Sequence, residues 1–212
     1  FYGAKVLHPK TIRPVIDAGI PLRVRNTFNP SHPGTLISAQ THSKNDGIIK
    51  AVTAIPDLAL VTIEGRGMLG VPGVAARTFA AVAATGTSVP LITQASSEQT
   101  ICFAVPLAAA ELVCRAEENE FCAEIARHDI DRVWSIGTVV IITAVGAGMR
   151  FTPGIAGRIF TALGSQNVNV IAIAQGSSEV SISVVVDAGD ALAGVRAIHS
   201  LIAGPNNSGK ST

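Results

Sequence analysis

The sequence is poor in charged residues, aromatic residues and cysteine, and these shortages exclude several classes of protein. Charged residues make up 15% of the 212 positions and the formal net charge is +1, which argues against a basic nucleic-acid-binding surface. Hydrophobic residues reach 48%, which argues against intrinsic disorder. The apolar runs stop short of the roughly 20 residues that a membrane-spanning helix needs. We therefore expect a globular chain without a nucleic-acid or membrane partner.

The three cysteines, Cys102, Cys114 and Cys122, are odd in number and lack Cys-x-x-Cys spacing. This argues against a disulfide framework and a zinc site, and we expect buried, reduced thiols. The five histidines show no metal-ligand spacing either. The chain begins with Phe1 and no secretory leader precedes it, so we expect a piece of a longer, cytoplasmic protein.

Two stretches of the sequence are copies of each other. Residues 71–105 read VPGVAARTFAAVAATGTSVPLITQASSEQTICFAV, and residues 152–186, 81 positions later, read TPGIAGRIFTALGSQNVNVIAIAQGSSEVSISVVV. The two align without a gap, and a Gln and a Ser-Ser-Glu recur together with the apolar positions. Hydrophobic patterning alone has no reason to repeat such polar residues, so we infer a tandem duplication of one structural unit. We call the two copies the first and the second repeat.

Each repeat predicts the same order of elements. A Pro-Gly pair opens a helix, two β-branched strands follow, and a second helix closes the unit. The expected first helices are 74–84 and 155–165, the strands are 88–93, 101–105, 169–174 and 181–186, and the second helices are 107–127 and 189–203. With one further strand before and after, this is the βαββαβ plan of a ferredoxin-like α+β domain.

The strand count differs between the repeats. Residues 132–136 can supply the last strand of the first repeat, but the second repeat runs into GPNNSGKST, whose Pro205, glycines and asparagines exclude a central strand. Residues 48–54 form a β-rich run before the first repeat, separated from a strand at 58–63 by a turn at residues 56–57. We expect this run to complete the sheet of the second repeat.

The chain then divides into an N-terminal part at 1–47, a first domain at 57–137, a second domain at 48–56 with 138–203, and a tail at 204–212. The tail contains a formal match to the phosphate-loop pattern Gly-x-x-x-x-Gly-Lys-Ser. That loop works between a strand and a helix, whereas a helix precedes the tail and the sequence ends one residue beyond the match. We expect no nucleotide site there.

The N-terminal part carries a first family resemblance. FYGAKVLHPKT, followed by IPLRVRNTFNPSHPGTLI, resembles the closing segment of the aspartate kinase catalytic domain, which has an α/β amino-acid-kinase fold. Residues 4–18 predict a loop and a short helix interrupted by Pro9 and Pro14, and 20–25 and 36–38 predict short strands; these pieces have too little apolar area to fold alone. The Lys-Phe-Gly-Gly-Thr-Ser phosphate-binding stretch of that family does not occur here. We therefore expect an inactive remnant with no catalytic residue and no cofactor; the resemblance implies ATP and Mg²⁺ only for the full-length enzyme.

The repeats carry a second resemblance. VPGVAARTFAAVA and FTPGIAGRIFTAL, each with its Gln-x-Ser-Ser-Glu, resemble ACT domains, specifically the tandem pair of aspartate kinases. They are most similar to the bifunctional aspartokinase/homoserine dehydrogenase enzymes, whose effector is threonine. Lysine-sensitive enzymes tend to carry Thr-Ser-Glu at that position. The resemblance implies a regulatory region that binds an end-product amino acid, threonine or alternatively lysine, and controls the phosphorylation of aspartate.

The start of each first helix is the candidate effector site. A helix that follows Pro-Gly presents unpaired backbone N–H groups and the positive end of its dipole, which suit a carboxylate. Val74 and Ala75, and likewise Ile155 and Ala156, supply those groups. The ammonium of an amino acid needs acceptors, and the resemblance places Gln94 and Gln175 at the two sites. The alternative is a plain helix-starting turn and a strand-end cap.

Four further polar residues belong to the candidate sites. Ser96 and Ser177 lie in the Ser-Ser-Glu connection between two strands, where serine is equally typical of a simple turn. Asn167 and Asn169 precede a strand of the second repeat, whereas the first repeat has Gly and Ser there. This difference predicts unequal sites.

Two expectations concern surfaces. The helix at 107–127 carries five glutamates, which indicate a solvated acidic face: Glu111, Glu117, Glu118, Glu120 and Glu124. Sheet edges of small apolar modules are usually covered, so we expect a homodimer or higher oligomer. A chain that is chiefly a dimerisation module with vestigial ligand sites is the alternative function.

Overall fold

The computed structural model describes residues 7, 9–38, 48–96, 98–146, 149, 152–176 and 180–202. The phosphate-loop pattern of the tail and Ser177 lie outside the described residues. The chain forms two compact units, Phe1–Asp46 and Gly47–Thr212, each described here by itself.

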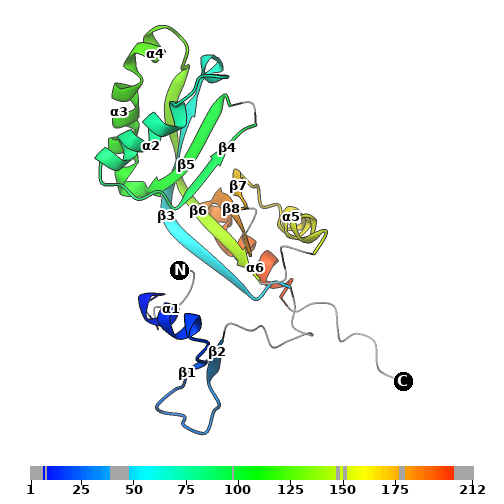
Figure 1. Cartoon of the computed structure of the whole chain (residues 1–212). Coiled ribbons are helices and arrows are strands. Elements are labelled where there is room, and N and C mark those ends of the chain that lie inside the picture. The colour runs from blue at the N-terminus through cyan, green and yellow to red at the C-terminus, as the bar shows by residue number, and fades with distance from the viewer. Residues whose placement is uncertain are drawn as a thin grey trace. The chain divides into compact units, whose positions relative to one another are not determined.

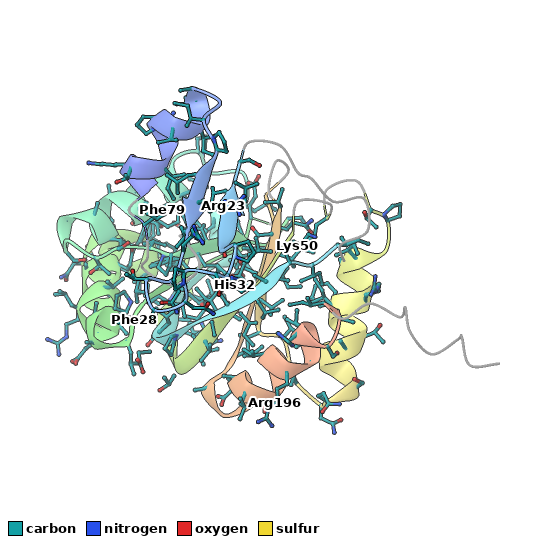
Figure 2. All side chains as sticks on the ribbon, turned by 90° about the horizontal axis from the view of Figure 1, so that it is seen from below. Arg23, Phe28, His32, Lys50, Phe79 and Arg196 are labelled. Atoms are coloured by element: carbon teal, nitrogen blue, oxygen red, sulfur yellow. The ribbon has the colours of Figure 1, made fainter. Side chains whose placement is uncertain are left out.

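The first unit is a helix followed by a hairpin. Helix α1 (Pro9–Asp17) precedes strands β1 (Leu22–Val24) and β2 (Thr35–Ile37), which pair antiparallel. Two arginines of the hairpin hold the loop between the strands, because Arg23 donates to the Pro33 carbonyl at 2.8 Å and Arg25 donates to the His32 carbonyl at 3.3 Å. The loop carries Phe28, which is 97% exposed (Figure 2).

The second unit is built on one antiparallel sheet of six strands in the order β4-β5-β3-β6-β8-β7 (Figure 1). Its strands are β3 (Ala51–Glu64), β4 (Leu91–Gln94), β5 (Thr100–Pro106), β6 (Arg132–Val145), β7 (Ala172–Ala174) and β8 (Ser181–Asp187). Its α-helices are α2 (Val74–Ala84), α3 (Ala110–Glu120), α4 (Cys122–Ala126), α5 (Ile155–Ser165) and α6 (Ala191–His199). Helices α2 and α5 have the bounds that the Pro-Gly pairs predict.

Strands β3 and β6 are long enough to serve both repeats. They pair with each other from Ala51 to Glu64, while β5 joins β3 only from Leu58 onward. Likewise β8 joins β6 only from Val139 onward. Residues 51–55 therefore pair with 141–145, in the part of the sheet that holds β8 and β7.

The turn expected at residues 56–57 is wrong. The strand continues through them, and the register of β3 against β6 shifts between Ile55 and Leu58. Asp57 adopts a positive φ of 59°. The Pro-Asp pair is thus accommodated as an irregularity in a continuous strand, because Pro removes one ladder donor without forcing the chain to reverse.

The residues just before β3 and just before β6, 81 positions apart, make equivalent backbone hydrogen bonds. The Lys50 N–H donates to the Val145 carbonyl at 2.7 Å, and the Asp131 N–H donates to the Glu64 carbonyl at 2.8 Å. The preceding residues, Ile49 and Ile130, are 3% and 1% exposed. Ile49 packs in the core with helix α5, whereas Ile130 packs in the core of the first repeat. Ile49, which precedes the first repeat in the sequence, therefore packs in the second repeat, and Ile130, which precedes the second repeat, packs in the first.

Three hydrophobic cores organise the second unit. One lies under α2 and α3, another under α5 and α6, and the buried residues of the third all come from strands. The buried residues of this third core are Leu58, Leu60, Leu91, Ala104, Val139, Ile141 and Val185. Strands β4 and β7, the two ends of the strand order, approach each other (Figure 1). The helix-free faces of the two repeats thus enclose a common core, and each fully buried aliphatic side chain contributes about 1.5–3 kcal/mol of transfer free energy.

The helix expected at 107–127 is divided at Phe121, whose φ of −104° and ψ of 20° separate α3 from α4. The acidic face expected on it is wrong for Glu117, which is 0% exposed. Val113, Glu117 and Phe121 recur at four-residue spacing, so all three lie on the side of α3 that faces the core. The expectation of buried thiols is wrong for Cys122, which is exposed, while Cys102 and Cys114 are half-buried.

Candidate functional site

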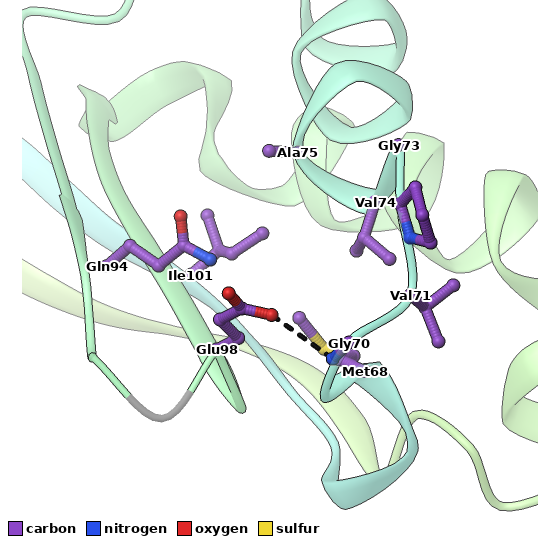
Figure 3. Close-up of a pocket in the computed structure, with 10 residues that line it drawn as sticks. Met68, Gly70, Val71, Gly73, Val74, Ala75, Gln94, Glu98 and Ile101 are labelled. Carbon is purple, nitrogen blue, oxygen red and sulfur yellow. Dashed lines mark hydrogen bonds between the residues drawn. The ribbon is translucent and has the colours of Figure 1, made fainter.

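A pocket of about 380 Å³ opens at the start of α2 (Figure 3). The loop before the helix and the helix start form one wall, and the ends of β4 and β5 form the other. The lining residues are Met68, Gly70, Val71, Pro72, Gly73, Val74, Ala75, Gln94, Glu98 and Ile101. The pocket is therefore assembled from the repeated Pro-Gly and the repeated Gln-x-Ser-Ser-Glu of the first repeat.

The start of α2 presents backbone donors. Gly73 is the N-cap in the left-handed region, with φ 90° and ψ −4°, a conformation that favours glycine. A glycine cap has no side chain to accept from the first-turn N–H groups, and no side-chain cap bond is made. The N–H groups of Val74 and Ala75 therefore remain available at the positive end of the helix dipole, which suits an anion.

The opposite wall carries acceptors. Gln94 ends β4 with an exposed side chain, and Glu98 lies in the β4–β5 connection with a positive φ of 56°. One carboxylate oxygen of Glu98 accepts from the Gly70 N–H at 3.1 Å, which ties this connection to the loop before α2 (Figure 3). The lining residues include one carboxylate and no lysine or arginine. The pocket thus combines anion-binding amides with acceptors for a cation.

Three of the residues predicted for the first repeat come together in the pocket: Val74, Ala75 and Gln94. Ser96 lies in the same strand connection but is not among the lining residues. Sequence reasoning missed Met68, Gly70 and Glu98 as lining residues. Glu98 had a signal, because the Ser-Ser-Glu containing it is repeated. Met68 and Gly70 belong to none of the motifs from which the site is predicted.

The second repeat has the same helix start. Gly154 caps α5 with φ 82° and no side-chain cap bond, and Ile155 and Ala156 follow it. Gln175 is exposed directly after β7. Asn167 and Asn169 lie beyond the other end of α5, so an eleven-residue helix, about 16 Å long, separates them from Ile155.

The described part of the chain shows neither a membrane-spanning helix nor a cluster of metal ligands. None of its helices is sufficiently long and apolar for a membrane span. Within the same residues, no group of three or more His, Cys, Asp or Glu side chains is placed to hold a metal ion.

A family model described as "ACT domain" matches residues 61–121 and 142–201. The chain belongs to the ACT domain family. The two matches fall on the two repeats, so the duplicated unit is an ACT domain that occurs twice. Its tandem ferredoxin-like α+β fold agrees with the fold expected from the sequence.

Curated relatives extend this similarity to nearly the whole chain. The bifunctional aspartokinase/homoserine dehydrogenase of Haemophilus influenzae is 43% identical over 202 residues, which cover 95% of this chain and 25% of that protein. A chloroplastic bifunctional enzyme of Arabidopsis thaliana is 43% identical over 204 residues, covering 94% and 22%. The chain spans about a quarter of the length of these relatives.

Solved structures of aspartate kinases have the same fold. The Clostridium acetobutylicum enzyme superposes with a TM-score of 0.82 and 30% identity, over 95% of this chain and 46% of that one. The ligand-free regulatory subunit of the Thermus thermophilus enzyme gives 0.61 and 29%, over 73% and 98%. Escherichia coli aspartokinase III, solved with lysine and aspartate, gives 0.72 and 25%, over 94% and 43%. The ACT pair is of the aspartate kinase type.

Proposed function

We propose that this chain binds an end-product amino acid and thereby regulates an aspartate kinase, the enzyme that phosphorylates L-aspartate with ATP. The observation that carries the proposal is the pocket at the start of α2, where uncapped helix amides face Gln94 and Glu98. A free α-amino acid is a zwitterion, and this arrangement offers a donor group and an acceptor group on opposite walls.

The two charges of the ligand are assigned to the two walls. The carboxylate accepts from the N–H groups of Val74 and Ala75, at the positive end of α2. The ammonium donates to the amide oxygen of Gln94 or to the carboxylate of Glu98. The side chain of the ligand then faces Met68 and Ile101, which supply apolar contacts.

Threonine is the effector that we propose for this pocket. The lining offers apolar surface for its methyl group and a glutamine for its hydroxyl, and two bifunctional aspartokinase/homoserine dehydrogenases are each 43% identical to this chain. Lysine is the second candidate, because one carboxylate oxygen of Glu98 accepts from the Gly70 N–H and the other can accept from the side-chain ammonium of lysine. The lysine complex of Escherichia coli aspartokinase III supports this alternative.

The second repeat provides a second, unequal site in this proposal. Ile155 and Ala156 supply its amides at the glycine-capped start of α5, and Gln175 supplies its acceptor. We also assign Ser96 and its sequence counterpart Ser177 to the two sites, because both belong to the repeated Gln-x-Ser-Ser-Glu. Asn167 and Asn169, which the first repeat lacks, lie one helix length away from Ile155, so we do not assign them to contacts with the ligand at the start of α5.

The division of the chain follows from the same proposal. We assign residues 57–137 to the first ACT domain and residues 48–56 with 138–203 to the second, because residues 51–55 pair with 141–145. We assign residues 1–47 to the end of the kinase domain. ATP and Mg²⁺ belong to the rest of that domain, since the phosphate-binding stretch is absent from this sequence.

Self-association is the remaining part of the proposal. Strands β4 and β7 expose the side chains of Ile92 and Ile173, at 49% and 43%, in equivalent positions of the two repeats. Exposed apolar side chains that gather in one area are often covered by a partner. We propose a homodimer, which sedimentation equilibrium at tens of micromolar checks, since standard interfaces hold at about that concentration; a clean monomer would contradict it.

Calorimetric titration of the chain with threonine, lysine and ATP tests the function. We expect saturable heat with threonine and none with ATP, and D-threonine serves as the matched control because it keeps the composition and both charges. Saturable heat with lysine alone would establish the second candidate. Absence of binding by both amino acids would leave the dimerisation module as the function, and heat with ATP alone would point to the tail.

A further inference from the structure

Arg77 makes the most extensive side-chain interaction in the described part of the first repeat. Its Nε donates to Glu120 at 2.7 Å and a terminal nitrogen donates to Glu124 at 2.8 Å. The other terminal nitrogen donates to the Glu120 backbone carbonyl at 2.9 Å. The guanidinium carbon lies 4.6 Å from the centre of the Phe121 ring. We call these four residues the Arg77 clamp.

The Arg77 clamp joins the start of α2 to the junction between two other helices. Glu120 ends α3, Phe121 separates α3 from α4, and Glu124 lies in α4. Helices α2 and α3 pack side by side (Figure 1). One guanidinium therefore fixes the position of α2 against both partners, and its planar fork suits this task because it donates in several fixed directions at once.

The clamp acts on the turn of α2 that lines the pocket. The Arg77 N–H donates to the Gly73 carbonyl at 3.0 Å, which closes the first turn of the helix. Gly73, Val74 and Ala75 of this turn line the pocket. A side chain rooted in that turn and held at its other end by α3 and α4 restricts how the backbone amides are aimed.

The clamp is a network and not a single surface ion pair. Isolated exposed pairs contribute little to stability, and networks with good geometry contribute more. The side chains of Arg77, Glu120 and Glu124 are 42%, 37% and 22% exposed, so the pairs are partly shielded from water. The hydrogen bond from Arg77 lowers the pKa of Glu124, as a carboxylate held in its charged form requires.

The second repeat has the arginine but lacks the clamp. Arg158, 81 positions after Arg77, is exposed, and its side chain has no partner among the residues that the structure describes. The positions equivalent to Glu120 and Phe121 hold Leu201 and Ile202. Neither can accept a hydrogen bond through its side chain. The starts of α2 and α5 therefore share a capping glycine, but among the described residues only the start of α2 is held by an arginine clamp.

We propose that Arg77 is a positioning residue for the effector site, holding the first turn of α2 so that its amides are ready for the ligand. The inference rests on the proposed amino-acid-binding function and deepens it. Because binding to a fixed site costs less ordering entropy than binding to a loose one, the first repeat is the tighter of the two sites. The clamp thus makes a duplicated sequence into two sites of unequal affinity.

Threonine calorimetry on matched variants of the full chain tests this. Arg77→Met removes the fork and keeps an unbranched side chain, and Arg158→Met is the same change at the equivalent position. We expect Arg77→Met to weaken the tighter site about tenfold, within the range typical of coupling between distinct groups. Arg158→Met should leave both sites within about twofold, since its guanidinium makes no contact that positions a helix.

A second pair of measurements separates positioning from loss of the fold. Glu124→Gln keeps the shape of the partner and removes its charge, and we expect a smaller loss at the tighter site with a thermal melt close to that of the wild type. The double variant Arg77→Met with Glu124→Gln should lose no more threonine affinity than Arg77→Met alone, because both changes break the same interaction. Hydrogen exchange should speed up at residues 74–77 in Arg77→Met and not at 155–158 in Arg158→Met.

The outcomes distinguish this inference from the proposed function. If the wild type binds neither threonine nor lysine, the proposed function fails and the inference fails with it. If the wild type binds threonine and folded Arg77→Met and Glu124→Gln bind equally well, the positioning role alone is overturned. Equal losses from Arg77→Met and Arg158→Met would also overturn it, since the clamp occurs in one repeat.

Discussion

Glu117 of α3 and Ile198 of α6 occupy equivalent positions, 81 residues apart, and both side chains are buried in the core of their own repeat. Their exposed fractions are 0% and 1%. Neither carboxylate oxygen of Glu117 has a hydrogen-bond partner within the described residues. An unpaired buried carboxyl is costly when ionised, so the first repeat carries a weak point in its core that the second repeat does not.

We predict that Glu117 makes stability fall with rising pH. Burial first, and then the charge of Glu120, raises the pKa of the Glu117 carboxyl to about 8. In the unfolded chain the pKa returns to its ordinary value of about 4.3, so between these values the unfolded state has lost the proton that the folded state keeps. The contribution of Glu117 to the free energy of unfolding is therefore largest below the pKa of the unfolded chain. It falls by a few kcal/mol as the pH rises to about 8, and it is constant at higher pH.

Denaturant unfolding at pH 5, 6.5 and 8 measures this effect. We expect Glu117→Gln to unfold with a weaker pH dependence than the wild type. Glu117→Ile, which installs the residue of the second repeat, should be more stable than both at pH 8 because it leaves no polar group unpaired. A wild-type chain that loses no stability relative to Glu117→Gln over this range would contradict the prediction.

A second prediction concerns the crossover of strands between the repeats. Ile49→Ala should loosen the second repeat and Ile130→Ala the first, although Ile49 precedes both in the sequence. Each substitution leaves a cavity where a side chain that is at most 3% exposed was packed. Each should cost about 2–5 kcal/mol, the usual range for such truncations.

Hydrogen exchange locates the loss for each member of this pair. Ile49→Ala should lower protection in β8 and α5, and Ile130→Ala should lower it in β5 and α2. If Ile49→Ala lowered protection in β5 and α2 and left β8 unaffected, Ile49 would pack in the first repeat and the prediction would be wrong.

A third prediction concerns the two glutamines. Gln94→Ala and Gln175→Ala should each remove one hydrogen bond to the effector and cost about 1–3 kcal/mol of binding free energy at that site. Both side chains are exposed, so the melting temperature should change little. Since the Arg77 clamp holds only the start of α2, the two losses should differ. Threonine titration beside a thermal melt measures this, and wild-type binding by both variants would make the glutamines strand-end caps.

Much of the fold can be read from the sequence where local chemistry decides it. The bounds of α2 and α5 follow from Pro-Gly pairs, because the glycine supplies the positive φ that the N-cap adopts in both repeats. The strand irregularity at Asp57 could not be read, because a Pro-Asp pair is also typical of a turn and only pairing with β6 selects the continuous strand.

The site is predictable only in part, for a related reason. Val74, Ala75 and Gln94 belong to repeated motifs and do meet in the pocket. Met68 is brought there by the path of a loop, which no periodicity records. Burial of Glu117 could have been read from its four-residue spacing to Val113 and Phe121, but the number of glutamates on that helix favoured a solvated face.

Hydrogen exchange with and without saturating threonine tests the central claim most directly, because it shows where the ligand lies as well as whether it binds. The account predicts slower exchange in peptides covering residues 70–77 and 94–98, with a weaker effect at 154–158. Saturable threonine binding without slower exchange at 70–77 and 94–98 would contradict the assignment of the pocket at α2 as the effector site.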